Sequence, residues 1–371
     1  MPVIDADAHV VETEHTWDFI PASDQHLRPV IVEVPDASGK PKRWWLIDGK
    51  LRRPAGEARD LPRTPEEEKW GLEEMERFAR ITGRNVTTPT ASRHMLDVSA
   101  RLRHMDELGI DYQFLYPTIF SIKLAERPEV QVAMSQGYNR WVADSWTLSE
   151  GRLAWACVLP LQVMDQALNE LRWAVEHGAR GVHMRGVEDD RMLHDPYFFP
   201  LYEEMSRLDI PVAVHIGNGN ADMYTLLNYG KGGSVFSATR LMSVAACHSW
   251  ILAGIPQEFP KLRIAFAEAA AGWVPYVVKD LRRRFPGRYG RPAPDNLLRE
   301  SRVWVACQTD DDLDYVLQYA GEDNLMIGTD YGHQDHSSEI EAMRNLRAQG
   351  AVAPGIADKI LGGNAAVVYG M

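Results

Sequence analysis

Short apolar runs alternate with amphipathic stretches along most of the chain. Apolar runs bounded by turn residues are typical of strands that are buried on both faces, and a 3.6-residue periodicity is typical of helices. We expect eight strands, at residues 3–10, 111–116, 153–159, 181–184, 210–215, 262–268, 303–307 and 324–330. We expect helices at 95–108, 128–148, 164–177, 197–208, 238–253, from about 270 to 285, and at 311–320, 338–348 and 354–361. Eight strand–helix units predict an α/β fold, a (β/α)8 TIM barrel. The alternative is a doubly wound open sheet, but no glycine-rich phosphate loop follows the first strand.

Residues 28–92 do not follow this pattern. Two apolar runs, 29–34 and 43–48, are separated by turn residues and predict a hairpin, and Asp48-Gly49 predicts a second tight turn. The remainder is rich in Arg, Pro, Glu and Thr, with one helical patch at 66–80. We interpret the segment as an insertion into a single domain spanning 1–371, acting as a lid over the active site. Its Trp44-Trp45 pair would cover either the pocket or a partner subunit.

The composition is that of a globular protein with a large core. The 371 residues are 45% hydrophobic and 25% charged, and the net charge of −12 argues against nucleic acid as a partner. No uncharged apolar run approaches the roughly 18 residues that cross a membrane, and no basic, apolar leader precedes the first strand. We therefore expect a cytoplasmic protein. The three cysteines are far apart and odd in number, so we expect buried thiols and no disulfide framework: Cys157, Cys247 and Cys307.

Polar residues alternate along the first predicted strand. Asp5, Asp7 and His9 are spaced two apart, so a regular strand would project all three on one face. Two carboxylates and an imidazole on one buried face are costly unless a cation lies between them, and both side-chain types are common ligands of divalent metals. The alternative is an exposed, solvated edge strand.

Further metal-type residues occupy the ends of other predicted strands, where barrel enzymes carry their catalytic groups. His215 follows a buried strand, with Ile216-Gly217 leaving room for a ligand, and Asp330 would need a cation or a hydrogen-bond network to stay charged. His183 is equally compatible with a hydrogen-bonded core histidine. The candidate metal ligands are Asp7, His9, His183, His215, Glu268 and Asp330.

The motifs carrying these residues resemble a known superfamily. They are Asp-Ala-Asp-Ala-His at the first strand, Val-Ala-Val-His215-Ile-Gly, Glu268-Ala-Ala-Ala-Gly-Trp-Val-Pro, Ile-Gly-Thr-Asp330-Tyr-Gly-His and Ile360-Leu-Gly-Gly-Asn-Ala-Ala-Val-Val-Tyr. This order resembles the amidohydrolase superfamily, in the amidohydrolase-related branch that includes aminocarboxymuconate-semialdehyde decarboxylase and the resorcylate-type decarboxylases. The resemblance covers 1–11 and about 95–371, and leaves the insertion unexplained.

The resemblance implies a divalent metal held by Asp7, His9, His215 and Asp330. The chain departs from the family pattern twice, because the family's His-x-His is Asp7-x-His9 here and its strand-6 histidine is Glu268. Carboxylate in place of imidazole favours iron or manganese, with zinc as an alternative. One ion or two remain open: His183 holds the position at which dinuclear members carry a bridging lysine. Glu12 is either a further ligand or a solvated loop residue.

Hydrolysis is the leading functional hypothesis. A metal-activated water would attack a carbonyl-type substrate (an amide, ester, thioester or ring), and Asp330 would take up its proton. His333 would act as electrophile or proton relay, and His248, Trp273 and Tyr331 would line the substrate pocket. For Trp273, packing under the loop is the alternative. The 11 Trp and 13 Tyr residues are compatible with an aromatic or polycyclic substrate.

Two other hypotheses stay open. The first is non-oxidative decarboxylation of an aromatic or unsaturated carboxylic acid, with Arg185 anchoring the substrate. The second is a metal-stabilised binding or scaffold protein that has lost catalysis, against which the retained Asp330 argues. In each enzyme hypothesis the partner is a small-molecule substrate, and we expect a homodimer because dimers are the commonest closed assembly.

Overall fold

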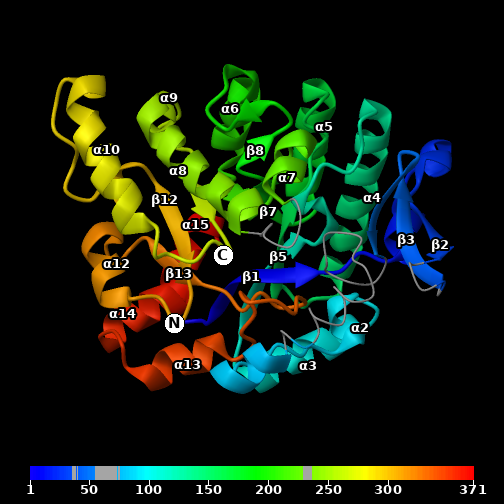
Figure 1. Cartoon of the computed structure of the whole chain (residues 1–371), viewed down its shortest axis with the longest axis horizontal. Coiled ribbons are helices and arrows are strands. Elements are labelled where there is room, and N and C mark those ends of the chain that lie inside the picture. Colours follow the sequence, from blue (N-terminus) through cyan, green and yellow to red (C-terminus); the bar gives the residue numbers. More distant parts are fainter. Residues whose placement is uncertain (36–38, 40, 55–72, 74–75, 229–235) are drawn as a thin grey trace.

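Eight parallel strands form the centre of the computed structural model, which describes residues 1–35, 39, 41–54, 73, 76–228 and 236–371 (Figure 1). In spatial order they are β1 (Ile4–Val10), β5 (Tyr112–Pro117), β6 (Leu153–Cys157), β7 (Ala179–Met184), β10 (Val212–Val214), β11 (Ile264–Phe266), β12 (Val303–Cys307) and β13 (Leu325–Ile327). The last strand returns to the first, since the His9 amide donates to the Tyr331 carbonyl at 2.7 Å and Ala8 bridges Tyr331 in parallel. The predicted (β/α)8 barrel is therefore confirmed.

Helices surround this sheet on its outer face (Figure 1). The long ones are α3 (Val98–Leu108), α4 (Pro128–Thr147), α5 (Met164–Glu176), α6 (Phe199–Leu208), α8 (Leu241–Ala253), α10 (Val274–Tyr289), α12 (Leu313–Ala320) and α13 (Ala342–Gln349). Shorter helical segments are α2 (Thr90–Arg93), α7 (Ala221–Leu227), α9 (Ile255–Glu258), α11 (Leu297–Glu300), α14 (Pro354–Asp358) and α15 (Asn364–Tyr369). Within the described residues, no helix combines the length and the apolar character needed to cross a membrane.

The ends of α3 illustrate how local sequence sets these boundaries. We expected the helix to begin at residue 95, but it begins at Val98 because the Asp97 side chain accepts a hydrogen bond from the Ala100 amide. It ends at Gly109, whose φ of 74° lies in the left-handed region that glycine adopts at little cost.

Apolar side chains fill the barrel interior at the amino-terminal end of the strands. Alanines on neighbouring strands leave space for a few large rings, among them Phe114, Tyr116 and Trp304. Helix α15 closes this end, where the Tyr369 ring stacks on Phe114 with centroids 3.7 Å apart. A separate apolar layer packs the outer face of the strands against the helices. The carboxyl ends of the strands are thus left for polar chemistry. All three cysteines are buried and free, as expected.

A β-bulge in β1 corrects one expectation about the first strand. Pairing with β5 shifts register between Asp5 and Ala8, so Ile4 and Ala6 face the barrel interior while Ala8 faces the outer layer. Asp5 therefore points away from Asp7 and His9, into hydrogen bonds from Gln113 and Thr329. Burial raises the pKa of Asp5 to about 6. The bulge turns the following polar residues inward, a role that bulges often have beside active sites.

The insertion forms a small antiparallel sheet beside α4 (Figure 1). The predicted hairpin is present as β2 (Val30–Pro35) and β3 (Pro41–Ile47), and β4 (Lys50–Pro54) follows the turn at Asp48 and Gly49. Trp45 is buried against Trp17 of the 3-10 segment η1 (Glu14–Phe19), at 6.0 Å between ring centroids. This contact buries Trp45 within the chain, and cover of the pocket or of a partner subunit by the Trp44-Trp45 pair stays a prediction. The predicted helical patch at 66–80 lies largely outside the described residues.

Candidate active site

Four of the predicted ligands converge at the carboxyl end of the barrel. Asp7 and His9 lie on β1, His215 directly follows β10, and Asp330 follows β13; all four are buried. The Nε2 atoms of His9 and His215 are 3.0 Å apart. Asp7 Oδ1 lies 3.6 Å and 3.5 Å from these two nitrogens, and Asp330 Oδ1 lies 3.4 Å from the Nε2 of His9.

Backbone carbonyls fix the orientation of both imidazoles. The Nδ1 of His9 is 3.2 Å from the Pro117 carbonyl oxygen, and the Nδ1 of His215 is 3.1 Å from that of Ile216. Because a carbonyl oxygen only accepts, each Nδ1 carries the proton and each Nε2 presents a lone pair to the centre of the cluster. Metal-binding histidines are commonly held in this way.

Three buried carboxylates also turn an oxygen toward this centre. Asp7 Oδ1, Glu268 Oε2 and Asp330 Oδ1 have no hydrogen-bond partner within the part of the chain that the structure describes. Glu268 Oε2 is 2.8 Å from the Nε2 of His215, where two acceptors need a cation or a proton between them. Burial and the neighbouring charges of Glu268 and Asp335 raise the pKa of Asp330 well above its ordinary value.

Two groups of these residues could each hold a metal ion. Asp7, His9 and His215 form one group, and His9, Glu268, Asp330 and His333 form another; in each, all ligand atoms lie within 4.8 Å of one another. Ligands about 2.1 Å from an ion are roughly 3 to 3.5 Å apart, which matches the separations above. The mixture of imidazole and carboxylate suits a divalent transition metal.

The backbone is strained where two of these side chains are positioned. Glu268 and Asp330 have φ values of 59° and 53°, in the left-handed region that non-glycine residues rarely adopt. Gly328 lets β1 approach closely, because a Cβ there would lie 2.1 Å from the Cβ of Asp7. Strain and close approach at one place indicate that the geometry of the cluster is imposed by the surrounding fold.

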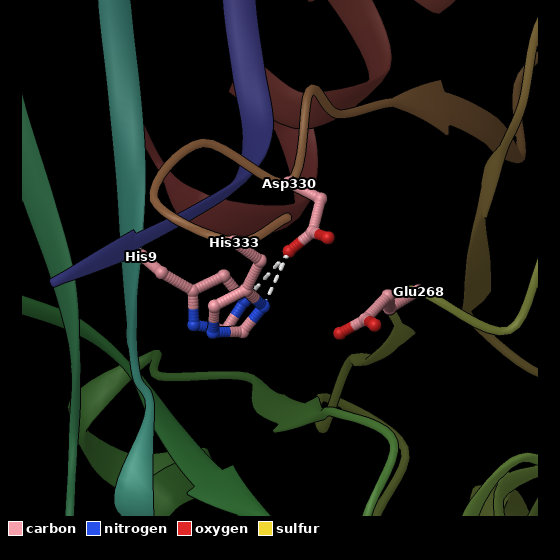
Figure 2. A group of neighbouring side chains, drawn as sticks. All are labelled: His9, Glu268, Asp330 and His333. Carbon is pink, nitrogen blue, oxygen red and sulfur yellow. Dashed lines mark ion pairs between the residues drawn. The ribbon is translucent and has the colours of Figure 1, made fainter. Parts of the chain in front are cut away.

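His333 lies next to the ligands and is oriented from two sides. Its Nδ1 is 2.8 Å from Asp330 Oδ1, and its ring stacks on His9 with centroids 3.8 Å apart (Figure 2). Its Nε2 is 3.1 Å from the hydroxyl oxygen of Thr118, which donates its own proton to the Val10 carbonyl and so accepts from His333. In the neutral ring the proton of His333 therefore lies on Nε2, and Nδ1 faces Asp330 Oδ1 with a free lone pair, so that a further proton could be taken up between them.

Sequence reasoning missed Thr118 and misjudged Glu12. Thr118 directly follows β5, so its place at a strand end was the available signal. Glu12 is buried, and its two oxygens accept the amide protons of Thr118 and Ile119 at 3.1 Å and 3.2 Å. It is therefore not a solvated loop residue, and it holds the loop that carries Thr118.

Comparison with known proteins places the chain in a family. A family model described as amidohydrolase matches residues 4–371. The chain belongs to this family. A decarboxylase of 2-amino-3-carboxymuconate-6-semialdehyde from Dictyostelium discoideum is 24% identical over 290 residues, covering 74% of this chain and 77% of the relative. The resemblance stated from the sequence motifs is confirmed.

Two solved structures show the same amidohydrolase fold. An amidohydrolase from Mycobacterium avium subsp. paratuberculosis K-10 is 20% identical with a TM-score of 0.76, covering 100% of this chain and 98% of that one. The 5-carboxyvanillate decarboxylase of Sphingomonas paucimobilis is 16% identical with a TM-score of 0.66, covering 100% and 99%. The match over full length agrees with one barrel that carries an insertion.

The structure separates His183 from the predicted ligands of this amidohydrolase. It lies on β7 and is buried, but its ring centroid is 6.3 Å from that of His215, and its Nε2 is 3.4 Å from the Phe120 carbonyl oxygen. It belongs to neither ligand group found among the described residues. The core-histidine alternative therefore describes it better, and the case for a second ion loses its strand-4 ligand.

The structure gives each of the four predicted substrate-binding residues a partner within the chain, and for Trp273 this matches the stated alternative of packing in its loop. His248 bonds to Asp280 at 2.9 Å between the outer helices α8 and α10. Tyr331 packs outward, its hydroxyl 2.7 Å from His104, because it follows Asp330 directly and so points the other way. Arg185, at the end of β7, has its guanidinium paired with Glu188. Trp273, in the loop after β11, donates a hydrogen bond from its Nε1 to the Ala270 carbonyl of the same loop at 2.8 Å.

Proposed function

We propose that this amidohydrolase is a metal-dependent, non-oxidative decarboxylase of an aromatic or unsaturated carboxylic acid with an oxygen beside the carboxylate. The observation that supports it most strongly is the buried cluster of two imidazole nitrogens and three carboxylate oxygens that lack partners. Similarity to a decarboxylase favours this reaction over hydrolysis, which the sequence analysis placed first. A single ion is enough to hold such an acid, and the alternative of a second ion has no ligand from His183.

Asp7, His9, His215 and Asp330 would hold the ion, with Glu268 close enough to join them. Two nitrogen and two oxygen donors suit manganese, iron or zinc. When bound, the ion supplies positive charge that holds the substrate carboxylate and its neighbouring oxygen, and stabilises the negative charge that develops as carbon dioxide leaves.

His333 and Asp330 form the proton-donating pair. In the reaction the bond between the carboxylate and its carbon breaks, the electron pair stays on that carbon, and carbon dioxide leaves. One proton must then move to the carbon, and a proton taken up between His333 Nδ1 and Asp330 Oδ1, which are 2.8 Å apart, would be placed to move. Thr118 keeps the His333 ring in position during the transfer.

An exchange assay tests the reaction class. Manganese-loaded protein is incubated with a panel of ortho-hydroxylated aromatic acids and carbon-13-labelled bicarbonate, and the acids are analysed by mass spectrometry. We expect label in the recovered carboxylate of at least one acid, together with carbon dioxide release, because decarboxylation runs in both directions on the same site. A chelated sample is the control. Release of acids from the matching esters or anilides, with no label incorporated, would contradict the proposal.

A further inference from the structure

A half-buried arginine extends across the catalytic end of the barrel. Arg240 closes the π-helical segment η5 (Phe236–Arg240), which follows β10 and continues into α8. Its Nη2 donates a hydrogen bond to the Ser337 hydroxyl, in the loop that follows β13. Since β11 and β12 lie between these two strands in the barrel, a side chain that joins their loops spans part of the mouth.

The acceptor of this bond is the neighbour in sequence of a residue that contacts the metal cluster. Ser338, the next residue after Ser337, donates from its hydroxyl to Asp330 Oδ2 at 2.7 Å. Ser337 is held in turn by Gln308 after β12, whose Nε2 donates to the Ser337 carbonyl at 3.3 Å. Arg240 is thus linked to a loop with a fixed position, one residue from the partner of a predicted metal ligand.

The guanidinium of Arg240 keeps a hydrogen-bond donor without a partner in the described part of the chain. Its Nε is buried without a hydrogen-bond partner, and no carboxylate of the described residues lies within ion-pair distance of it. Other cations near this face are already paired: Arg185 with Glu188, and Lys123 with Glu126 and Asp189. A buried donor without a partner is costly unless a ligand supplies an acceptor.

We propose that Arg240 anchors a second anionic group on the substrate, so that the preferred substrates are dicarboxylates. This inference rests on the proposed function, in which the metal cluster holds the first carboxylate. The planar fork of a guanidinium matches a carboxylate with two parallel bonds, which favours this group over an uncharged one. The anchor also adds positive charge at the mouth, which would favour capture of an anionic substrate beside the extra acids of the site.

Binding of two matched acids tests the anchor independently of turnover. Salicylate carries one carboxylate beside a hydroxyl, and 4-hydroxyisophthalate adds a second carboxylate to the same ring. Calorimetry with manganese-loaded protein is expected to show 4-hydroxyisophthalate binding about 10- to 100-fold more tightly, as a charge-assisted hydrogen bond implies. In Arg240→Gln this preference is expected to fall below about threefold, with salicylate affinity nearly unchanged, and Arg240→Lys should restore part of it.

Arg191→Gln is the matched control. Arg191 is a partly exposed arginine of the β9 segment (Arg191–Met192), paired with Asp190, and its loss removes the same charge from the protein. The preference should survive there, and thermal melts establish that each variant is folded. Equal affinity of the wild type for the two acids would overturn this inference and leave the proposed function standing. The same holds if folded Arg240→Gln keeps the preference for 4-hydroxyisophthalate. Failure of both acids to bind the metal-loaded wild type overturns the proposed function, and the inference with it.

Discussion

Asp330→Asn is expected to lower kcat for decarboxylation by about a thousandfold while leaving the fold intact. Asp330 is expected to contribute in two ways: its Oδ1 faces His9 Nε2 at 3.4 Å among the predicted metal ligands, and the same atom lies 2.8 Å from His333 Nδ1, where a proton could be taken up. An amide removes the charge and the proton site but keeps the size, so the hydrogen bond from Ser338 can still form. Carbon dioxide release at saturating substrate measures the effect.

The control for this variant is Asp310→Asn. Asp310 is an exposed carboxylate at the same end of the barrel that pairs with Arg84 at 2.9 Å. Its replacement should leave kcat within about twofold, because the Asp310 carboxylate is exposed and Arg84 keeps Glu339 as a second partner. Circular dichroism of both proteins separates a catalytic loss from unfolding. An Asp330→Asn enzyme with near wild-type kcat would remove Asp330 from the chemistry.

Chelation of the metal is expected to lower Tm by about 5 to 10 °C. Asp7, Glu268 and Asp330 each bury an oxygen without a hydrogen-bond donor, so without an ion they repel one another in a site that water scarcely reaches. An ion bound only to the folded state stabilises it by about 4 kcal/mol when its concentration is 1,000 times Kd. Differential scanning calorimetry with and without chelator measures the shift.

Asp7→Asn supplies the matched variant for this measurement. It removes one of the three buried charges, so its metal-free form should melt above the metal-free wild type, and its response to metal should be small. Identical Tm values for the wild type with and without chelator would mean that the cluster is stable without a cation.

The barrel and the convergence of four predicted ligands could be foreseen because they depend on local rules. Apolar runs locate strands, and the strand-end rule places Asp7, His9, His215 and Asp330 at one end of the barrel. Asp5 shows the limit of such rules, since strict alternation gave it the direction of Asp7. The bulge that turns it outward depends on pairing with β5, which lies more than one hundred residues away.

The remaining errors concern long-range partners. His248 looks like a pocket residue until its neighbour Asp280 on another helix is known. Arg185 looks like a free cation until Glu188, three residues on, is seen to fold back on it. Thr118 and Arg240 carry no motif, and their relevance arises only because separate loops bring them beside His333 and Ser337. Such contacts are set by the closed barrel and not by any one segment.

Metal content per chain tests the central claim most directly. Protein expressed in medium supplemented with manganese, iron and zinc is desalted and analysed by plasma emission spectroscopy, beside His215→Asn prepared identically. We predict close to one divalent ion per chain in the wild type and a small fraction of one in the variant. No ion in an active wild-type enzyme, or the same content in His215→Asn, would contradict a metal centre built on Asp7, His9, His215 and Asp330.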